Sequence, residues 1–250
     1  MILGILQTDS VLEQFQPAHG DYPDMVQSLL ACLDAQVTCI IYRVEEGAYP
    51  ADPDDCDAFI ITGSRKSVYD DEDWIRQLED YVRLLHQRRK KTLGICFGHQ
   101  LIAQALGGRV AAAATGWGVG VKESHFVSRP EFITDNCDAF NLLVSHKDQV
   151  IEASPEMELL AGNDYCPWAM YRVGDHFLCV QGHPEFKKAY SRDLMNYRRE
   201  MLGEAVYEAG MASLARETHE QAVFRWMLNF LGGNSPEQIN SHEQINSHER

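Results

Sequence analysis

Gly94-Ile95-Cys96-Phe97-Gly98-His99-Gln100 lies between a short apolar run, 92–95, and a helix-like segment that extends to about Leu106. A G-x-C-x-G sequence between strand and helix is the cysteine version of a nucleophile elbow. The glycines remove side chains that would clash in so tight a bend, and the N-terminal N–H groups of the helix favour a thiolate. The pattern predicts a nucleophilic Cys96. The other interpretation is a buried structural cysteine beside two packing glycines.

A second motif reduces the weight of that other interpretation. Gln181-Gly182-His183-Pro184-Glu185 follows the continuously apolar run 177–180, which we expect to be a central strand buried on both faces. In an extended chain His183 and Glu185 point to the same face, and Pro184 favours extended geometry at His183. A carboxylate on one ring nitrogen would leave the other nitrogen free to take a thiol proton, which is the logic of a catalytic triad. A surface His and Glu at a strand end are the common alternative.

The rest of the first half alternates apolar runs with amphipathic segments, which indicates βαβ units and a mostly parallel sheet. The expected strands are 2–6, 37–42, 58–62 and 92–95, and the expected helices are 23–35 and 73–89. We therefore expect a three-layer, flavodoxin-like α/β fold. Helices would cover both faces of the sheet, and the site would lie at the carboxyl ends of its strands.

From about Arg109 the sequence becomes rich in predicted strands, at 119–127, 141–145, 157–161, 168–173 and 176–181. After Pro184 it returns to helix, and Thr218 with Gln221 suggests a capping box before a last helix that Gly232 ends. Residues 1–233 are expected to form one domain. In 234–250 the hexapeptide Glu-Gln-Ile-Asn-Ser-His occurs twice in tandem, and we expect a polar tail outside the fold.

Composition limits the function further. With 250 residues, 45% of them hydrophobic, the chain can bury a large core, and its net charge of −15 makes nucleic acid and anionic membranes unsuitable partners. No apolar run is long enough to span a bilayer, and the N-terminus resembles a strand more than a signal peptide. Seven cysteines without CxxC spacing argue against a disulfide framework and a structural zinc site, so we expect a cytoplasmic protein without metal or cofactor.

Taken together, GICFGHQ and QGHPEF resemble the class I glutamine amidotransferases, the triad-type glutaminases that supply ammonia to synthetases. The likeness extends from the first strand to about Gly233. It implies that Cys96 is the nucleophile that forms a γ-glutamyl thioester, that His183 acts as general base and then acid, and that Glu185 orients His183. The substrate would be a small molecule, either glutamine or a γ-glutamyl compound.

The resemblance also implies the surroundings of the triad. Ile61-Thr62-Gly63-Ser64 matches the oxyanion loop of the family, which makes the backbone N–H groups of Gly63 or Ser64, with that of Phe97, the expected oxyanion donors. The residues expected at the amino-acid end of the substrate are Gln100, Trp117, Ser145 and His146. We expect His99 to be a packed residue of the helix. The histidines at 125, 146 and 176 lack metal-ligand spacing.

Two features depart from the common family pattern. No glutamate stands near Trp117-Gly118, which leaves open how the amino group of the substrate is neutralised, and the oxyanion loop continues with Arg65-Lys66. The sequence looks most like stand-alone family members, which include γ-glutamyl peptidases. The alternatives are an ammonia-supplying glutaminase subunit of a separate synthetase and a non-catalytic partner-binding protein. For a peptidase, Arg65 and Lys66 would offer positive charge to the leaving group.

Overall fold

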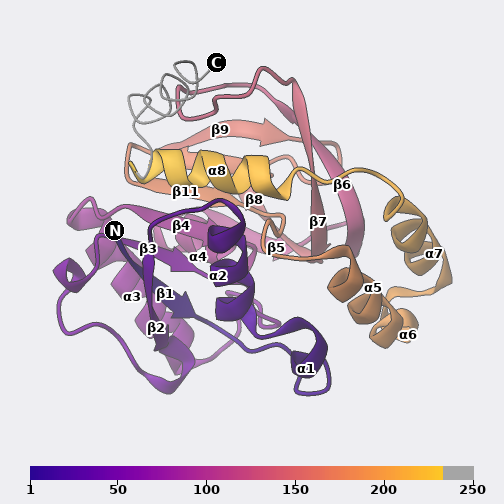
Figure 1. The fold of residues 1–250 in the computed structure, drawn as a ribbon, viewed down its shortest axis with the longest axis horizontal. Coiled ribbons are helices and arrows are strands. Elements are labelled where there is room, and N and C mark those ends of the chain that lie inside the picture. The colour runs from indigo at the N-terminus through magenta and orange to yellow at the C-terminus, as the bar shows by residue number, and fades with distance from the viewer. Residues whose placement is uncertain (233–250) are drawn as a thin grey trace, which may run out of the picture.

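Five parallel strands form one half of a nine-stranded sheet in the computed structural model, which describes residues 1–232 (Figure 1). Their order across the sheet is β2-β1-β3-β4-β11, and every neighbouring pair runs parallel. Their bounds are Ile2–Gln7 for β1, Thr38–Arg43 for β2, Ala58–Ile61 for β3, Thr92–Ile95 for β4 and Phe177–Val180 for β11. All five carboxyl ends therefore lie at one edge of the sheet.

The other half of the sheet is antiparallel and continues from β11 through β10, β9 and β6 to β7. These strands are β10 (Met170–Val173), β9 (Met157–Gly162), β6 (Gly118–Phe126) and β7 (Ala139–His146). A separate two-stranded sheet pairs β5 (Arg109–Ala112) with β8 (Asp148–Glu152). The strand-rich second half expected from the sequence is this antiparallel extension.

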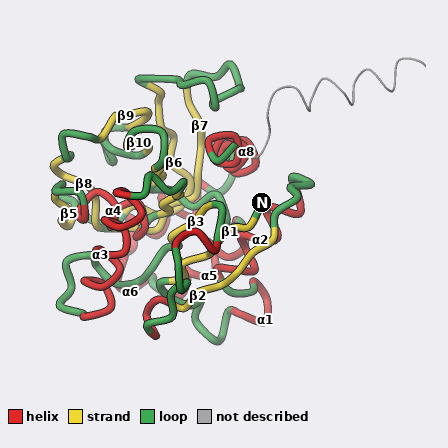
Figure 2. The backbone as a smooth tube through the Cα atoms, turned by 90° about the vertical axis from the view of Figure 1, so that its left-hand side faces the viewer, coloured by secondary structure: helices red, strands yellow, loops and turns green. Residues whose placement is uncertain are grey.

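Helices cover both faces of the parallel half, so the fold has three layers (Figure 2). One face packs against α2 (Tyr22–Cys32) and α8 (Glu220–Phe230), and the other against α3 (Asp73–Gln87) and α4 (Phe97–Ala105). Strand β11 shows why its sequence is continuously apolar: Leu178 and Val180 enter the first core, whereas Phe177 and Cys179 enter the second. Alternation along a strand buried on both faces leaves no position for a polar side chain.

A third apolar cluster lies beside the antiparallel half, where α5 (Lys188–Tyr197) and α7 (Glu204–Ser213) pack on β6 and β7. The remaining helical segments are short: α1 (Gln16–His19), α6 (Arg199–Leu202) and the 3₁₀ turns η1 (Val44–Glu46) and η2 (Pro53–Asp55). No helix within residues 1–232 is long and apolar enough to cross a lipid bilayer.

The predicted elements are present, with ends that shift by a few residues, whereas β5 and β8 had no strand prediction. The capping box expected at the last helix is wrong, because His219 and not Thr218 precedes α8. His219 is fixed instead by β7: its Nδ1 accepts a hydrogen bond of 2.9 Å from the backbone N–H of Asn141. The predicted tail, 234–250, lies outside the described residues.

Candidate active site

The residues singled out by the sequence lie at one edge of the sheet, at the carboxyl ends of three neighbouring parallel strands. Gly63 and Ser64 follow β3, Cys96 follows β4 and His183 follows β11, and β4 pairs with both of the other strands. The carboxyl ends of parallel strands are where open α/β sheets bind their ligands. Strand pairing thus brings together two motifs that are far apart in the sequence.

Cys96 occupies a strained turn between β4 and α4. Its backbone angles are φ 50° and ψ −98°, in a region that residues with a side chain rarely adopt. The flanking glycines allow the turn: a Cβ at Gly94 would lie 2.9 Å from the Gly98 backbone, and one at Gly98 would lie 2.5 Å from the carbonyl oxygen of Ile61. The helix can therefore start directly above the sheet, and the geometry is that of the predicted elbow.

His183 and Glu185 form a buried pair at the end of β11. Nδ1 of His183 donates to Oε1 of Glu185 at 2.7 Å, and the two side chains are only 4% and 2% exposed. The ring of Phe186 stacks on the imidazole with centroids 3.8 Å apart, and the backbone N–H of His183 donates to the carbonyl of Leu143 on β7 at 2.8 Å. The imidazole is thus held in one orientation, with Nε2 left for another partner.

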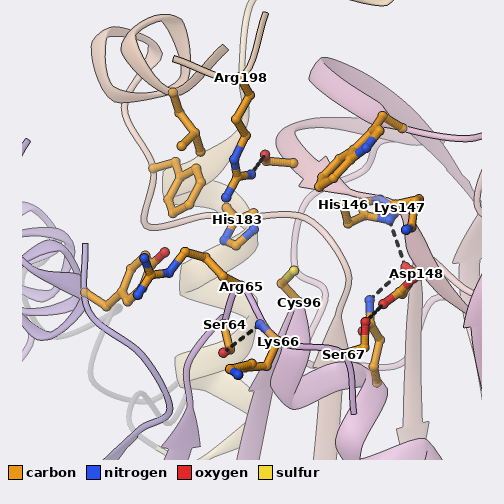
Figure 3. Close-up of a pocket in the computed structure, with 16 residues that line it drawn as sticks. Ser64, Arg65, Lys66, Ser67, Cys96, His146, Lys147, Asp148, His183 and Arg198 are labelled. Atoms are coloured by element: carbon orange, nitrogen blue, oxygen red, sulfur yellow. Dashed lines mark hydrogen bonds between the residues drawn. The ribbon is translucent and has the colours of Figure 1, made fainter. Parts of the chain in front are cut away.

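The sulfur of Cys96 lies beside the imidazole of His183 (Figure 3). Gly63 of the oxyanion loop lies close to both side chains, since a Cβ there would lie 3.0 Å from Cε1 of His183 and 3.7 Å from Cβ of Cys96. Burial lowers the pKa of His183, but the Glu185 carboxylate and the Cys96 sulfur outweigh burial and raise this pKa to about 10. The arrangement favours a protonated His183 imidazole beside the Cys96 sulfur.

The backbone of the oxyanion loop is anchored by two residues that directly follow strand β1. The hydroxyl of Thr8 donates to the carbonyl of Gly63 at 2.9 Å, and Asp9 accepts a hydrogen bond of 2.8 Å from the backbone N–H of Arg65. Among residues 1–232, the N–H groups of Ser64 and Phe97 have no hydrogen-bond acceptor. These donors are therefore free for a ligand, as the oxyanion prediction requires, and whether they bind one stays a prediction.

A cavity of about 120 Å³ opens beside the Cys96 sulfur (Figure 3). All four residues predicted to bind substrate line it: Gln100, Trp117, Ser145 and His146. The side-chain N–H₂ of Gln100 already donates to the carbonyl of Asp148 at 2.8 Å and to Oε1 of Gln181 at 3.1 Å. Gln100 is therefore rigidly held at the cavity wall, with both amide protons used by the protein.

The two histidines that flank the site are buried and neutral. Burial lowers the pKa of His146 to about 3 and that of His99 to about 3. Nε2 of His99 donates to the carbonyl of Trp168 at 2.7 Å, which confirms His99 as a packed residue. Nδ1 of His146 donates to the carbonyl of Asp148, whereas its Nε2 is buried without a partner in the described part of the chain.

Arg65 and Lys66 line the cavity, but each already has an acidic partner. Arg65 forms a two-pronged ion pair with the buried carboxylate of Asp9, at 2.8 and 2.7 Å, and Lys66 pairs with Glu72. The expectation that these two side chains offer positive charge to a leaving group is therefore wrong. Instead, Arg65 holds the oxyanion loop against β1.

Sequence reasoning missed three charged residues of the cavity, Lys147, Asp148 and Arg198. Asp148, at the start of β8, accepts hydrogen bonds from the hydroxyls of Ser67 and Tyr69. Arg198, between α5 and α6, reaches the cavity from the third apolar cluster. No motif marked Arg198, and the signal for Lys147 and Asp148 was only their position directly after Ser145 and His146, which the resemblance places at the substrate. Among residues 1–232, no three His, Cys, Asp or Glu side chains are grouped so that they could hold a metal ion.

Comparisons with known proteins agree with this geometry. The family model described as glutamine amidotransferase class-I matches residues 21–196. γ-Glutamyl peptidase 3 of Arabidopsis thaliana is 32% identical over 190 residues, which cover 73% of this chain and 75% of that protein. γ-Glutamyl peptidase 4 of the same plant is 35% identical over 184 residues, or 71% of each chain. A glutamine amidotransferase from Thermotoga maritima has the same fold, with a TM-score of 0.73, 15% identity and coverage of 94% and 98%.

Proposed function

Because the chain belongs to the class I glutamine amidotransferase family and hydrolyses glutamine or γ-glutamyl amides, we propose that it cleaves γ-glutamyl peptides through Cys96, His183 and Glu185. One observation carries the proposal: the buried His183–Glu185 hydrogen bond of 2.7 Å beside the thiol of a strained elbow. The choice of peptides over glutamine is supported by relatives named γ-glutamyl peptidases, which match over most of their own length.

The first half-reaction transfers the γ-glutamyl group to the enzyme. The Cys96 thiolate attacks the γ-carbonyl carbon, and the negative oxygen that forms accepts hydrogen bonds from the N–H groups of Ser64 and Phe97. The His183 imidazolium then donates its Nε2 proton to the amide nitrogen. The carbon–nitrogen bond breaks, the amine leaves and a γ-glutamyl thioester remains on Cys96. A pKa of about 10 keeps His183 protonated for this step at neutral pH.

The second half-reaction releases glutamate. Neutral His183 removes a proton from a water molecule, whose oxygen attacks the thioester carbonyl, and the same oxyanion donors stabilise the second tetrahedral intermediate. The carbon–sulfur bond breaks, which returns Cys96 as a thiolate beside an imidazolium. Glu185 keeps the ring in one tautomer throughout, because its carboxylate accepts the hydrogen bond from Nδ1–H of His183 in both half-reactions.

The amino-acid end of the substrate would lie toward Gln100 and Asp148. Asp148 is the one acidic side chain among those that line the cavity in the described structure, and it is held by two hydroxyl groups. We assign it the role of neutralising the α-amino group, in the absence of the glutamate that many relatives carry near Trp117. A carboxylate held by hydroxyls stays available to an ammonium group that enters the cavity.

The test is hydrolysis by the purified protein and by two cysteine variants. Wild-type protein and Cys32→Ala, which changes an exposed cysteine away from the site, should release glutamate from γ-glutamyl peptides, whereas Cys96→Ala should show no turnover. Turnover that persists in Cys96→Ala would show another nucleophile. Glutamine hydrolysis that appears only with a second protein, and no peptide hydrolysis, would identify a synthetase subunit instead.

A further inference from the structure

The cavity has a positive wall in a strongly acidic protein. The chain carries a net charge of −15, yet four basic side chains line the cavity: Arg65, Lys66, Lys147 and Arg198. The first two are paired with carboxylates, as described above. Within residues 1–232, neither Lys147 nor Arg198 has a carboxylate partner. An unpaired cation at a cavity in a chain of this charge points to an anionic group on the ligand.

Arg198 is held in place by neutral groups. Its Nη1 donates to Oγ of Ser145 at 2.9 Å, and its guanidinium carbon lies 5.5 Å from the ring centre of Trp117. A guanidinium has five N–H donors in a fixed planar fork, so one hydrogen bond and one aromatic contact leave most of its donors unused. The side chain is oriented by its neighbours without being neutralised by them, as a site for a carboxylate requires.

The position of Arg198 identifies the end of the substrate that it faces. His183 gives its proton to the leaving amine, so the leaving group must lie on the His183 side of the sulfur. Arg198 lies on that side, and Lys147 lies across the cavity near Asp148 (Figure 3). The same wall carries Phe186, whose ring stacks on His183. Arg198 therefore faces the group that departs, whereas Lys147 faces the glutamyl end. Of the four residues expected at the amino-acid end, Gln100 and His146 lie against Asp148, whereas Ser145 and Trp117 contact Arg198 and so adjoin the leaving group.

We propose that Arg198 binds the free carboxylate of the leaving amino acid or short peptide and so selects substrates with an unblocked C-terminus. The inference rests on the proposed γ-glutamyl peptidase activity and adds its substrate class. Glutamine, which releases ammonia, would gain nothing from Arg198. The wall formed by Tyr22, Phe186 and Leu194 would contact the apolar part of the leaving group.

The experiment compares acids with their amides. γ-Glutamyl-alanine and γ-glutamyl-alanyl-glycine, each with a free or an amidated C-terminus, differ within a pair only in the charge that Arg198 would bind. For wild-type protein we expect kcat/KM to be about tenfold or more higher for the acid in at least one pair, the size of a charge-assisted hydrogen bond. Arg198→Met should reduce this ratio to about one, and Arg198→Lys should retain part of it. Arg192→Met, on α5 just before Arg198 but outside the cavity, should keep the wild-type ratio.

The acid-to-amide ratio separates recognition from a structural role, because a distorted Ser145 or Trp117 would slow acid and amide alike. A wild-type ratio near one in both pairs would overturn the proposal. So would an equal loss on acid, amide and glutamine in Arg198→Met, or a ratio lost in Lys147→Met and kept in Arg198→Met. If wild-type protein cleaves none of these compounds, the peptidase function itself fails, which is a different result.

Discussion

Replacing Glu185 with glutamine tests how the histidine is tuned. The substitution keeps the size of the side chain and removes its charge, 2.7 Å from Nδ1 of His183. The pKa of His183 stands at about 10 because the Glu185 carboxylate and the Cys96 sulfur outweigh burial. Without the carboxylate, burial is opposed by the sulfur alone, so the pKa of His183 must fall.

The size of the change follows from the bond that is lost. A hydrogen bond to a charged group contributes about 1.5–3 kcal/mol, and about 1.4 kcal/mol corresponds to one pH unit or to a factor of ten in rate. Glu185→Gln should therefore lower kcat by about ten- to hundredfold. It should also move the alkaline limb of kcat/KM, where the imidazolium loses its proton, down by about one to two pH units. Activity should remain measurable, because the nucleophile and the oxyanion donors are intact.

The assay is the release of glutamate from a γ-glutamyl peptide between about pH 5 and about pH 11, which covers the expected limbs of the profile. Glu217→Gln removes a carboxylate from an exposed position and should reproduce the wild-type profile. A Glu185→Gln protein with wild-type kcat and an unshifted alkaline limb would refute the assigned role of Glu185. A shift of that limb to higher pH would show that the Glu185 carboxylate does not raise the pKa of His183.

Two further substitutions test the framework around the nucleophile. Gly98→Ala places a Cβ 2.5 Å from the carbonyl oxygen of Ile61, so the backbone must move at a cost of about 1–3 kcal/mol. The melting temperature should fall by several degrees, and the activity should fall with it. An unchanged melting curve would contradict the close approach. Thr8→Val removes the hydroxyl that donates to the carbonyl of Gly63, so the oxyanion loop loses its anchor. Steady-state kinetics should show kcat reduced by about tenfold with little change in KM. A change in KM alone would assign Thr8 to substrate binding instead.

Much of the site could be predicted because its decisive features are local. The elbow needs only glycines on both sides of Cys96, and the His183–Glu185 pair needs only the two-residue period of an extended chain. Both predictions match the geometry in the structure. The prediction for Arg65 and Lys66 was wrong because an ion pair depends on which acidic residue lies nearby in space, and the partner of Arg65 follows a different strand.

The sequence by itself determined the elements, the turn that places Cys96 at the end of β4 and the orientation of His183 by Glu185, because each depends on backbone geometry within a few residues. Only the tertiary structure decided that β4 lies between β3 and β11, and this order brings thiol, imidazole and oxyanion loop to one edge. It also decided that Arg198 reaches the cavity without an acidic partner among residues 1–232. Strand order and charge pairing result from many weak contacts between distant segments, and no short motif encodes them.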